Sequence, residues 1–314
     1  MTLTVLAGSA NVPLANAIAA ELGTTPRSRI AQRFADTELH VLIEETVRDD
    51  DVYLIQPTSP PVDEHIMELL FLADACRRAG ARRLTAVTPY FGYARQDRRG
   101  TGREPIGARV IADLIEAAGF DRVIAIDLHT PAIEGFFRLP LEHLTAASIL
   151  AEAIRPSIAS RSIVVAPDMG AAKLAERYQG LLNVPMVVLR KTRLSGHEVS
   201  VGGIIGDGVR ERAPLIVDDM ITTGATIEAA VKGLLAAGCL PEITVAATHA
   251  LFVGPALERL RALPIRQMTT TNSVAVASPL PFPVQIVNLA PMIAKTIARL
   301  HRNVRLHSVT AASV

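Results

Sequence analysis

The sequence predicts an α/β protein with mainly parallel sheets. Short runs rich in Val and Ile alternate with longer segments rich in Ala and Leu, whose apolar residues recur at helical spacing. The short runs are apolar throughout, and such strands are typical of parallel sheets that helices cover on both faces. At 314 residues, the chain is long enough for two ordinary domains.

The expected elements follow this alternation along the chain. Uniformly apolar, β-branched runs predict strands at residues 3–6, 52–55, 84–87, 123–126, 163–165, 186–189, 215–217, 243–246 and 284–287. Amphipathic segments predict helices at roughly residues 13–22, 64–79, 106–118, 146–154, 171–178, 227–237 and 291–301. Strands and helices therefore alternate, as in repeated strand–helix–strand units.

The composition argues against several classes of protein. Apolar residues make up 49% of the chain and charged residues 20%, as in folded globular proteins. The net charge of +1 provides no global field for nucleic acid or a membrane surface. No run reaches the length of a membrane span, and the N-terminus lacks a basic segment before its apolar residues. Cys76 and Cys239 lie among Ala and Leu, which predicts buried reduced thiols and a cytoplasmic protein.

A faint internal repeat suggests a duplicated domain. A strand, a helix, an Ala-Gly pair and a second strand are expected in this order at residues 52–88 and again at residues 215–248. Only the second copy carries an acidic pair after its first strand. We therefore expect one half to have retained a ligand pocket, with chance similarity between two such units as the alternative.

The stretch at residues 217–226 has features that suit a sugar phosphate. Asp218 and Asp219 follow an apolar strand, and a turn with three threonines and one glycine leads into a helix. The first turn of a helix offers N–H groups and a positive dipole end to a phosphate. Carboxylates accept hydrogen bonds from the adjacent hydroxyls of a ribose. The alternative is an acidic strand end whose Thr222 or Thr223 only caps the helix.

Residues 88–99 combine three aromatic side chains with three arginines after an expected strand. Aromatic rings can stack on a base, and guanidinium groups bind polyphosphate in a forked geometry. An ion-paired surface loop is the alternative.

Two further strands end at polar residues. His129 and Asp168 follow expected strands, at the ends where α/β sheets bind ligands. A carboxylate suits a hard cation, whereas a lone histidine is more often a core or helper residue than a metal ligand. Asp168 is alternatively the N-cap of a helix that begins near Gly170. The basic loop at residues 189–197 is, by composition alone, a solvated charged hairpin.

Together these segments resemble the phosphoribosyl diphosphate (PRPP) synthetases. Residues 217–226 are similar to the PRPP signature that this family shares with phosphoribosyltransferases. Residues 88–99 resemble its ATP-binding segment, and residues 32–38 a second ATP segment that reaches the nucleotide across a subunit boundary. Residues 127–130 resemble its magnesium-contacting motif. Residues 191–196 resemble its mobile catalytic loop, in wording most like the branch common among archaeal enzymes.

The resemblance implies two tandem phosphoribosyltransferase-like domains, each a mainly parallel sheet flanked by helices. The first, 1–143, would carry the ATP segments, and the second, 144–290, the ribose 5-phosphate site and the catalytic loop. Residues 291–314 would form a helix and tail that return to the first domain. The implied reaction moves the diphosphoryl group of ATP to the C1 hydroxyl of ribose 5-phosphate, giving PRPP and AMP. Mg²⁺, a cytoplasmic location and a homo-oligomer built from dimers, often a hexamer, are also implied.

The resemblance also implies roles for individual residues. ATP would bind at Phe34, Asp36, Thr37, Glu38, Arg95 and Gln96. Ribose 5-phosphate would bind at Arg193, Asp218, Asp219, Thr222, Thr223, Gly224, Ala225 and Thr226. Mg²⁺ would be arranged by His129 and Asp168, and the transferring group would be stabilised by Lys191 and Arg193.

The chain departs from the family pattern at some positions. Thr37 stands where the family usually has glycine, and Thr222 where it usually has a third Asp. Ala132, Glu134 and Glu142 stand where many members have Gln, Gln and Asp. The last three departures suggest a divergent branch.

Two other functions remain open from the sequence. A phosphoribosyltransferase would use the same loop to consume PRPP, but it would need only one such domain and no Lys191–Arg193 segment. A catalytically silent paralogue that binds nucleotide and regulates a partner enzyme is the second alternative. The presence of Lys191, Arg193, His129 and Asp168 speaks against it.

Overall fold

The computed structural model describes residues 1–193, 199–206, 208–277 and 279–303, with side chains outside residues 191–202. The chain folds into two compact units. Unit 1 comprises Met1–Thr145, Ser273–Ala275 and Asn288–Val314, and unit 2 comprises Ala146–Asn272 and Val276–Val287.

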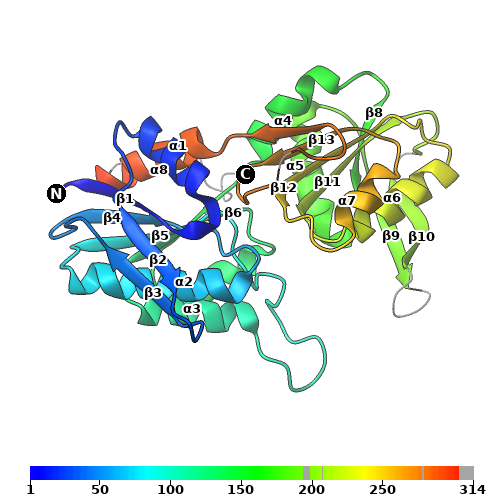
Figure 1. The fold of residues 1–314 in the computed structure, drawn as a ribbon. Helices are drawn as coiled ribbons and strands as arrows, with labels where there is room; N and C mark the ends of the chain where they lie inside the picture. The colour runs from blue at the N-terminus through cyan, green and yellow to red at the C-terminus, as the bar shows by residue number, and fades with distance from the viewer. Residues whose placement is uncertain (194–198, 207, 278, 304–314) are drawn as a thin grey trace. The chain divides into compact units, whose positions relative to one another are not determined.

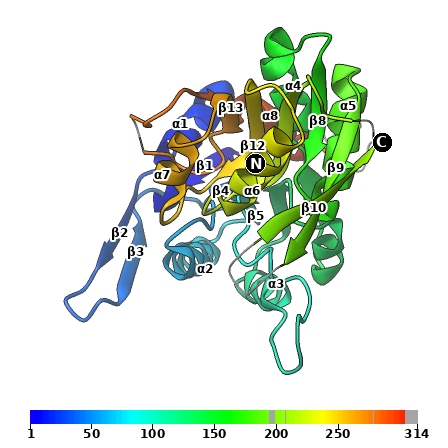
Figure 2. The same ribbon diagram turned by 90° about the vertical axis from the view of Figure 1, so that its right-hand side faces the viewer.

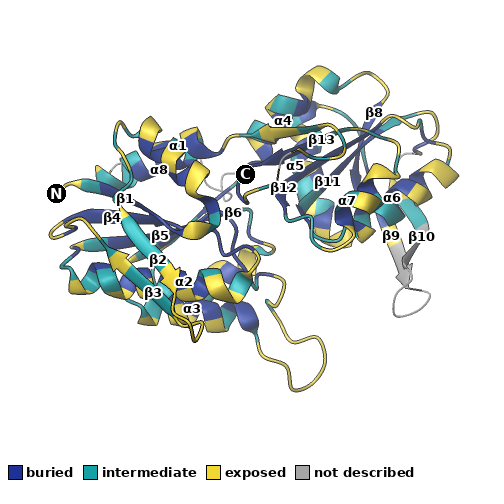
Figure 3. Cartoon of the chain, in the orientation of Figure 1, coloured by how far each residue is buried: buried dark blue, intermediate teal, exposed yellow. Residues whose placement is uncertain are grey.

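The centre of unit 1 is a five-stranded sheet in which every neighbouring pair is parallel. In spatial order its strands are β1 (Leu3–Ala7), β4 (Asp51–Ile55), β5 (Arg83–Thr88), β6 (Arg122–Ile126) and β7 (Leu141–Leu144). Every residue of β4 is buried, and Figure 3 shows the middle strands in dark blue. The uniformly apolar runs of the sequence thus form strands with both faces covered, as predicted.

Helices cover both faces of this sheet (Figure 1). They are α1 (Val12–Glu21), α2 (Val62–Arg78), α3 (Gly107–Ala117) and α8 (Ala290–His301), with the short 3-10 helices η1 (Ser9–Asn11) and η2 (Pro131–Phe136). α2 and α3 share one hydrophobic core with the strands, in which Leu69, Leu84 and Ile115 are fully buried. α1 and α8 pack against each other on the opposite face, so the last described helix belongs to unit 1.

A separate antiparallel hairpin projects from unit 1 (Figure 2). It consists of β2 (Arg29–Arg33) and β3 (Leu39–Ile43). No strand is predicted from the sequence in this region. Both strands are half-buried or exposed. β2 begins and ends with arginine and β3 contains His40, so neither is the uniformly apolar run that marks the central strands.

Unit 2 contains a seven-stranded sheet that is parallel except for its first pair. In spatial order its strands are β10 (Val199–Gly206), β9 (Met186–Arg193), β8 (Ser162–Ala166), β11 (Ala213–Ile221), β12 (Ile243–Ala250), β13 (Ile265–Thr271) and β14 (Val284–Val287). Its helices are α4 (Ala147–Ile154), α5 (Ala172–Leu182), α6 (Ala225–Ala236) and α7 (Ala256–Arg261), with the 3-10 helices η3 (Arg155–Ser157) and η4 (Met169–Ala171). α6 and α7 share one core cluster with the sheet, whereas α4 and α5 pack against each other outside that cluster.

The two units repeat one topology, which confirms the predicted duplication. Strands β1, β4, β5, β6 and β7 of unit 1 occur in the same spatial order as β8, β11, β12, β13 and β14 of unit 2. Hairpin β9–β10 continues the sheet of unit 2 through β8. The corresponding hairpin β2–β3 has separated from its sheet, with a single parallel bridge between Leu6 and Arg27 beside it.

The structure corrects some expected elements. The prediction that the strand before the acidic pair ends at residue 217 is wrong, because β11 continues to Ile221 and pairs with β12 as far as Ala250. Asp218 and Asp219 therefore lie inside a strand, where pairing with β12 outweighs the low strand propensity of aspartate. Strands β7, β10 and β13 and helix α7 are likewise not predicted from the sequence, because they are short or rich in Thr, Gly and charged residues.

The remaining compositional expectations concern thiols and membranes. Cys76 and Cys239 are buried free thiols, as predicted, and burial raises the pKa of Cys76 to about 12. Among the helices of the described residues, none has the length and apolar character needed to cross a membrane.

Candidate active site

The strand order of unit 2 reverses between β8 and β11. From β8 the chain continues to β9 on one side, whereas from β11 it continues to β12 on the other. Ligands of open α/β sheets bind at the carboxyl ends of strands beside such a reversal. Asp168 follows β8, while Asp218 and Asp219 lie near the end of β11. The topology thus gathers three of the predicted residues at one edge of the sheet.

Negative charge is concentrated at this edge. Burial raises the pKa of Asp218 well above its usual 3.8, and the charge of Asp219 beside it adds to this increase. The charge of Asp168 raises it further, although the Asp219 N–H that donates to Asp218 Oδ1 at 2.9 Å opposes the shift. A group that donates hydrogen bonds or carries positive charge would relieve this crowding. The edge is therefore suited to ribose hydroxyls or a cation.

Asp168 is an N-cap as well as a member of this acidic group. Its Oδ1 accepts hydrogen bonds from the N–H groups of Gly170 at 3.0 Å and Ala171 at 3.3 Å. The capping alternative is therefore confirmed. It does not exclude a second partner, because a carboxylate has two oxygens and several acceptor positions.

Residues 222–226, called the phosphate loop here, connect β11 to α6. Gly224 is the N-cap of α6, and its φ is 74°. No side chain makes a capping hydrogen bond there, so the alternative that Thr222 or Thr223 caps the helix is wrong. An added Cβ at Gly224 would lie 3.2 Å from Cγ of Leu260. Both the left-handed backbone and this close approach favour glycine. The result is a first turn of α6 that is exposed at Ala225 and partly exposed at Thr226, and its N–H groups suit a phosphate.

Arg259 of α7 holds the phosphate loop in place. Its Nη1 donates to the carbonyl of Thr223 at 2.6 Å, and its Nε forms an ion pair with Glu228 of α6 at 2.7 Å. The Val253 N–H donates to the carbonyl of Thr222 at 3.0 Å. Arg259 cannot be identified from the sequence, because no local pattern indicates a contact across 36 positions.

Unit 1 contains a cavity of about 400 Å³ beside the ends of β5 and β6. Three of the predicted residues, Arg95, Gln96 and His129, line it together with Asp97, Arg98, Gly100, Glu104 and Pro105. Its volume lies within the range of small-molecule sites. Its lining is mainly polar and charged, which suits a phosphorylated ligand.

Hydrogen bonds join the two loops that line this cavity. Thr130 Oγ1, next to His129, donates to Asp97 Oδ2 at 2.8 Å, and the Asp97 side chain is 8% exposed. Gln96 lies against the start of α3, where an added Cβ on Gly107 would be 2.6 Å from Gln96 Oε1. Glycine at this position therefore leaves room for the Gln96 side chain.

The hairpin residues predicted to bind ATP do not line this cavity. Phe34, Asp36, Thr37 and Glu38 lie in the turn between β2 and β3, and Phe34 is 52% exposed. Thr37 has φ of 75°, a left-handed conformation that favours glycine, so the departure at this position is accommodated with strain. Within one chain, therefore, these residues stand apart from Arg95 and His129.

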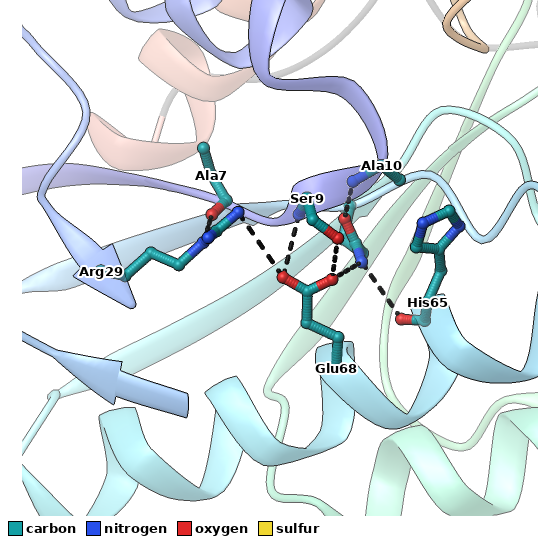
Figure 4. A network of polar contacts seen from close by, with 7 residues as sticks. Ala7, Ser9, Ala10, Arg29, His65 and Glu68 are labelled. Atoms are coloured by element: carbon teal, nitrogen blue, oxygen red, sulfur yellow. Dashed lines mark hydrogen bonds and ion pairs between the residues drawn. The ribbon is translucent and has the colours of Figure 1, made fainter. Parts of the chain in front are cut away.

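The ends of β1 and β4 in unit 1 hold a closed polar network instead of an acidic edge (Figure 4). The buried carboxylate of Glu68 accepts hydrogen bonds from the N–H and hydroxyl of Ser9 and from Gln56 Nε2. Gln56 Oε1 in turn accepts from the Ala10 N–H at 3.0 Å. Arg29 Nη2 lies 3.6 Å from Glu68 Oε1 and forms an ion pair with it. Unit 1 thus satisfies these groups internally where unit 2 presents carboxylates.

The described residues could hold a metal ion only if a bound substrate supplied some of its ligands. No three His, Cys, Asp or Glu side chains among them are arranged to hold a metal on their own. Mg²⁺ in phosphate-transfer sites is usually held by one or two carboxylates together with substrate phosphates and water. Asp168 fits that role, whereas His129 belongs to the other unit. Lys191 and Arg193 end β9, but their side chains lie outside the described residues.

Comparison with known proteins assigns the chain to a family. Residues 3–119 match the sequence profile of the N-terminal domain of ribose phosphate pyrophosphokinase, and residues 140–275 match that of the phosphoribosyl transferase domain. The chain is 41% identical to the ribose-phosphate pyrophosphokinase of Gloeobacter violaceus, over 98% of this chain and 92% of that protein. It is also 41% identical to that of Rhodopirellula baltica, over 96% of each chain.

A solved structure gives the same result. The phosphoribosylpyrophosphate synthetase of Mycobacterium smegmatis superposes with a TM-score of 0.90 and 36% identity, over 96% of this chain and all of that one. The two phosphoribosyltransferase-type domains expected from the sequence are therefore confirmed. The chain belongs to the ribose-phosphate pyrophosphokinase family.

Proposed function

We propose that this protein is a ribose-phosphate diphosphokinase, which converts ATP and ribose 5-phosphate to AMP and PRPP. The observation that carries the proposal is identity of about 40% to enzymes of this name over nearly the whole of both chains. In the reaction, the C1 oxygen of ribose 5-phosphate bonds to the β-phosphorus of ATP. The bond between that phosphorus and the α,β-bridging oxygen breaks, AMP leaves, and the C1 hydroxyl loses its proton.

Unit 2 would bind ribose 5-phosphate. Asp218 and Asp219 accept hydrogen bonds from the ribose hydroxyls, which relieves the crowding that raises the pKa of Asp218. The phosphate loop and the first turn of α6 bind the 5-phosphate, with Thr222, Thr223 and Thr226 as hydroxyl donors.

Unit 1 would bind ATP. Arg95 and Gln96 contact the nucleotide in the cavity beside β5 and β6, with His129 at its wall. The hairpin residues Phe34, Asp36, Thr37 and Glu38 would serve the cavity of a second copy, because they do not reach the cavity of their own chain. The proposed enzyme is therefore at least a homodimer.

Positioning and charge stabilisation would supply the catalysis, as in other phosphoryl transfers. Lys191 and Arg193 are proposed from the sequence pattern alone to stabilise charge on the transferring group, with Arg193 also contacting ribose 5-phosphate. Asp168 and His129 would contact Mg²⁺ that accompanies the substrates. When bound, Mg²⁺ neutralises phosphate charge and orients the polyphosphate. Because both substrates are phosphorylated metabolites, we place the reaction in the cytoplasm, with no nucleic acid or membrane partner.

A labelled-substrate assay tests this function. ATP labelled at the β-phosphate is incubated with Mg²⁺ and ribose 5-phosphate, and products are separated. The proposal requires equal amounts of AMP and PRPP, with the label in PRPP. Release of ADP, or no AMP at all, would refute it. The phosphoribosyltransferase alternative instead requires consumption of added PRPP and a free base, and the match to synthetases across both domains does not favour it.

A further inference from the structure

The turn between β6 and His129 has a strained backbone. Asp127 directly follows β6 and has φ of 40°, which places a non-glycine residue in the left-handed region. Such a conformation persists only where the surrounding structure fixes it. His129, two residues later, lines the cavity. The conformation of Asp127 and Leu128 therefore sets where the His129 side chain enters the cavity.

Strand β7 supplies two constraints on this turn. The Asp127 N–H donates to the carbonyl of Leu144 at 3.0 Å. The next N–H along the chain, that of Leu128, donates to His143 Nε2 at 3.0 Å. His143 is 8% exposed and pairs with Ala125 in the sheet, so its imidazole is held beside the end of β6.

A second hydrogen bond orients the His143 ring. Because Nε2 accepts from Leu128, it carries no proton, and the ring hydrogen must be on Nδ1. Nδ1 then donates to Glu134 Oε1 at 2.7 Å. Glu134 lies in η2, the helix that directly follows the turn. The His143 imidazole of β7 is thus hydrogen-bonded both to the turn, at Leu128, and to η2, at Glu134.

We propose that His143, oriented by Glu134, is a positioning residue for the reaction. It fixes the Leu128 backbone and so directs His129 toward ATP. His143 does not itself line the cavity, so it acts through the turn rather than on substrate. This inference rests on the proposed function.

Substituting His143 separates this role from general stability. His143→Ala leaves the Leu128 N–H without its acceptor, and we expect kcat/KM for ATP to fall about tenfold to a hundredfold, as for other residues that orient a ligand-binding histidine. KM for ribose 5-phosphate should stay within about twofold, since that substrate binds in unit 2. His143→Gln should recover most of the activity, because its Oε1 can accept from Leu128.

The control is His65→Ala in the same unit. His65 is partly buried, and its ring bonds the carbonyl of Ser59 at 2.6 Å, away from the turn. This variant should keep both KM values. Hydrogen exchange in the free protein gives a readout that needs no activity. The Leu128 amide should exchange faster in His143→Ala and slow again in His143→Gln.

Two results for the His143 variants would overturn the inference. It fails if His143→Gln is no better than His143→Ala, or if His143→Ala weakens the use of both substrates equally. Should His143→Ala not fold, Glu134→Ala at the more exposed partner must give a smaller loss confined to ATP. If the wild-type protein makes no AMP, the proposed function fails. The affinity of the same variants for Mg–ATP, measured by calorimetry, then decides on His143.

Discussion

Replacing Gly224 with alanine tests whether the phosphate loop shapes the site for the 5-phosphate. Gly224 has φ of 74°, and an added Cβ would lie 3.2 Å from Cγ of Leu260. A left-handed backbone costs an alanine about 1–2 kcal/mol. Leu260 is 1% exposed in the core of unit 2, so it has little room to move away. We expect the free energy of unfolding to fall by about 2 kcal/mol.

The loop can also relieve this strain by moving, which would displace the first N–H groups of α6 from the phosphate. If the 1–2 kcal/mol is lost from binding instead, KM for ribose 5-phosphate rises about fivefold to thirtyfold. KM for ATP should not change. The assay follows AMP release with one substrate varied and the other saturating, and urea unfolding gives the stability of the same samples.

Gly180→Ala is the matched control. Gly180 lies in α5, and an added Cβ there has no neighbour within 4 Å. Alanine is favoured over glycine in a helix by about 0.5–1 kcal/mol, so this variant should be more stable, with both KM values unchanged. A wild-type KM for ribose 5-phosphate in Gly224→Ala, together with wild-type stability, would refute our account of the loop.

Three other substitutions test the remaining contacts. Because the raised pKa of Asp218 means that its ionisation destabilises the folded state, Asp218→Asn should raise the Tm of the ligand-free protein near neutral pH. The gain in Tm should disappear as pH falls toward 3.8, and a gain that persists in acid would contradict this explanation. The same substitution should raise KM for ribose 5-phosphate. Arg259→Ala should raise KM for ribose 5-phosphate about tenfold, whereas Arg266→Ala, an exposed ion-pair control, should not. Thr130→Val removes a donor from the mostly buried Asp97 and should raise KM for ATP about fivefold; an equal effect on ribose 5-phosphate would count against the link.

The sequence predicts the central strands well because burial on both faces leaves a continuous apolar signal. The run at residues 52–55 is found as β4, whose five residues are all buried. The hairpin β2–β3 has no such signal, since its side chains are half-buried or exposed. The extension of β11 through Asp218 and Asp219 depends on hydrogen bonds to β12, which lies in a distant part of the chain. Local propensity cannot register that pairing.

The candidate site divides along similar lines. Asp168, Asp218 and the phosphate loop are identifiable because each lies near the carboxyl end of a strand that has a recognisable apolar run, and the topology brings these strand ends together. Arg259 and His143 are not, because each acts through a backbone group far from it in sequence, Thr223 and Leu128. Such contacts position the binding residues without forming part of any motif. The roles of Lys191 and Arg193 remain predictions from the sequence.

The duplicated topology explains why the two units would bind their ligands at the ends of non-equivalent strands. In unit 2, Asp168 and Asp218 lie near the ends of β8 and β11, and their carboxylates repel each other. A ligand that donates hydrogen bonds or carries positive charge would relieve this repulsion. In unit 1, the equivalent ends of β1 and β4 are closed by Glu68 and Gln56, which satisfy the N–H groups of Ser9 and Ala10. Buried groups that are already paired have little to gain from a ligand. Accessible polar groups, among them Arg95 and Gln96, lie beyond the ends of β5 and β6, where they line the cavity. The internal pairing at the ends of β1 and β4 therefore leaves the cavity beside β5 and β6 as the place for the second substrate in unit 1.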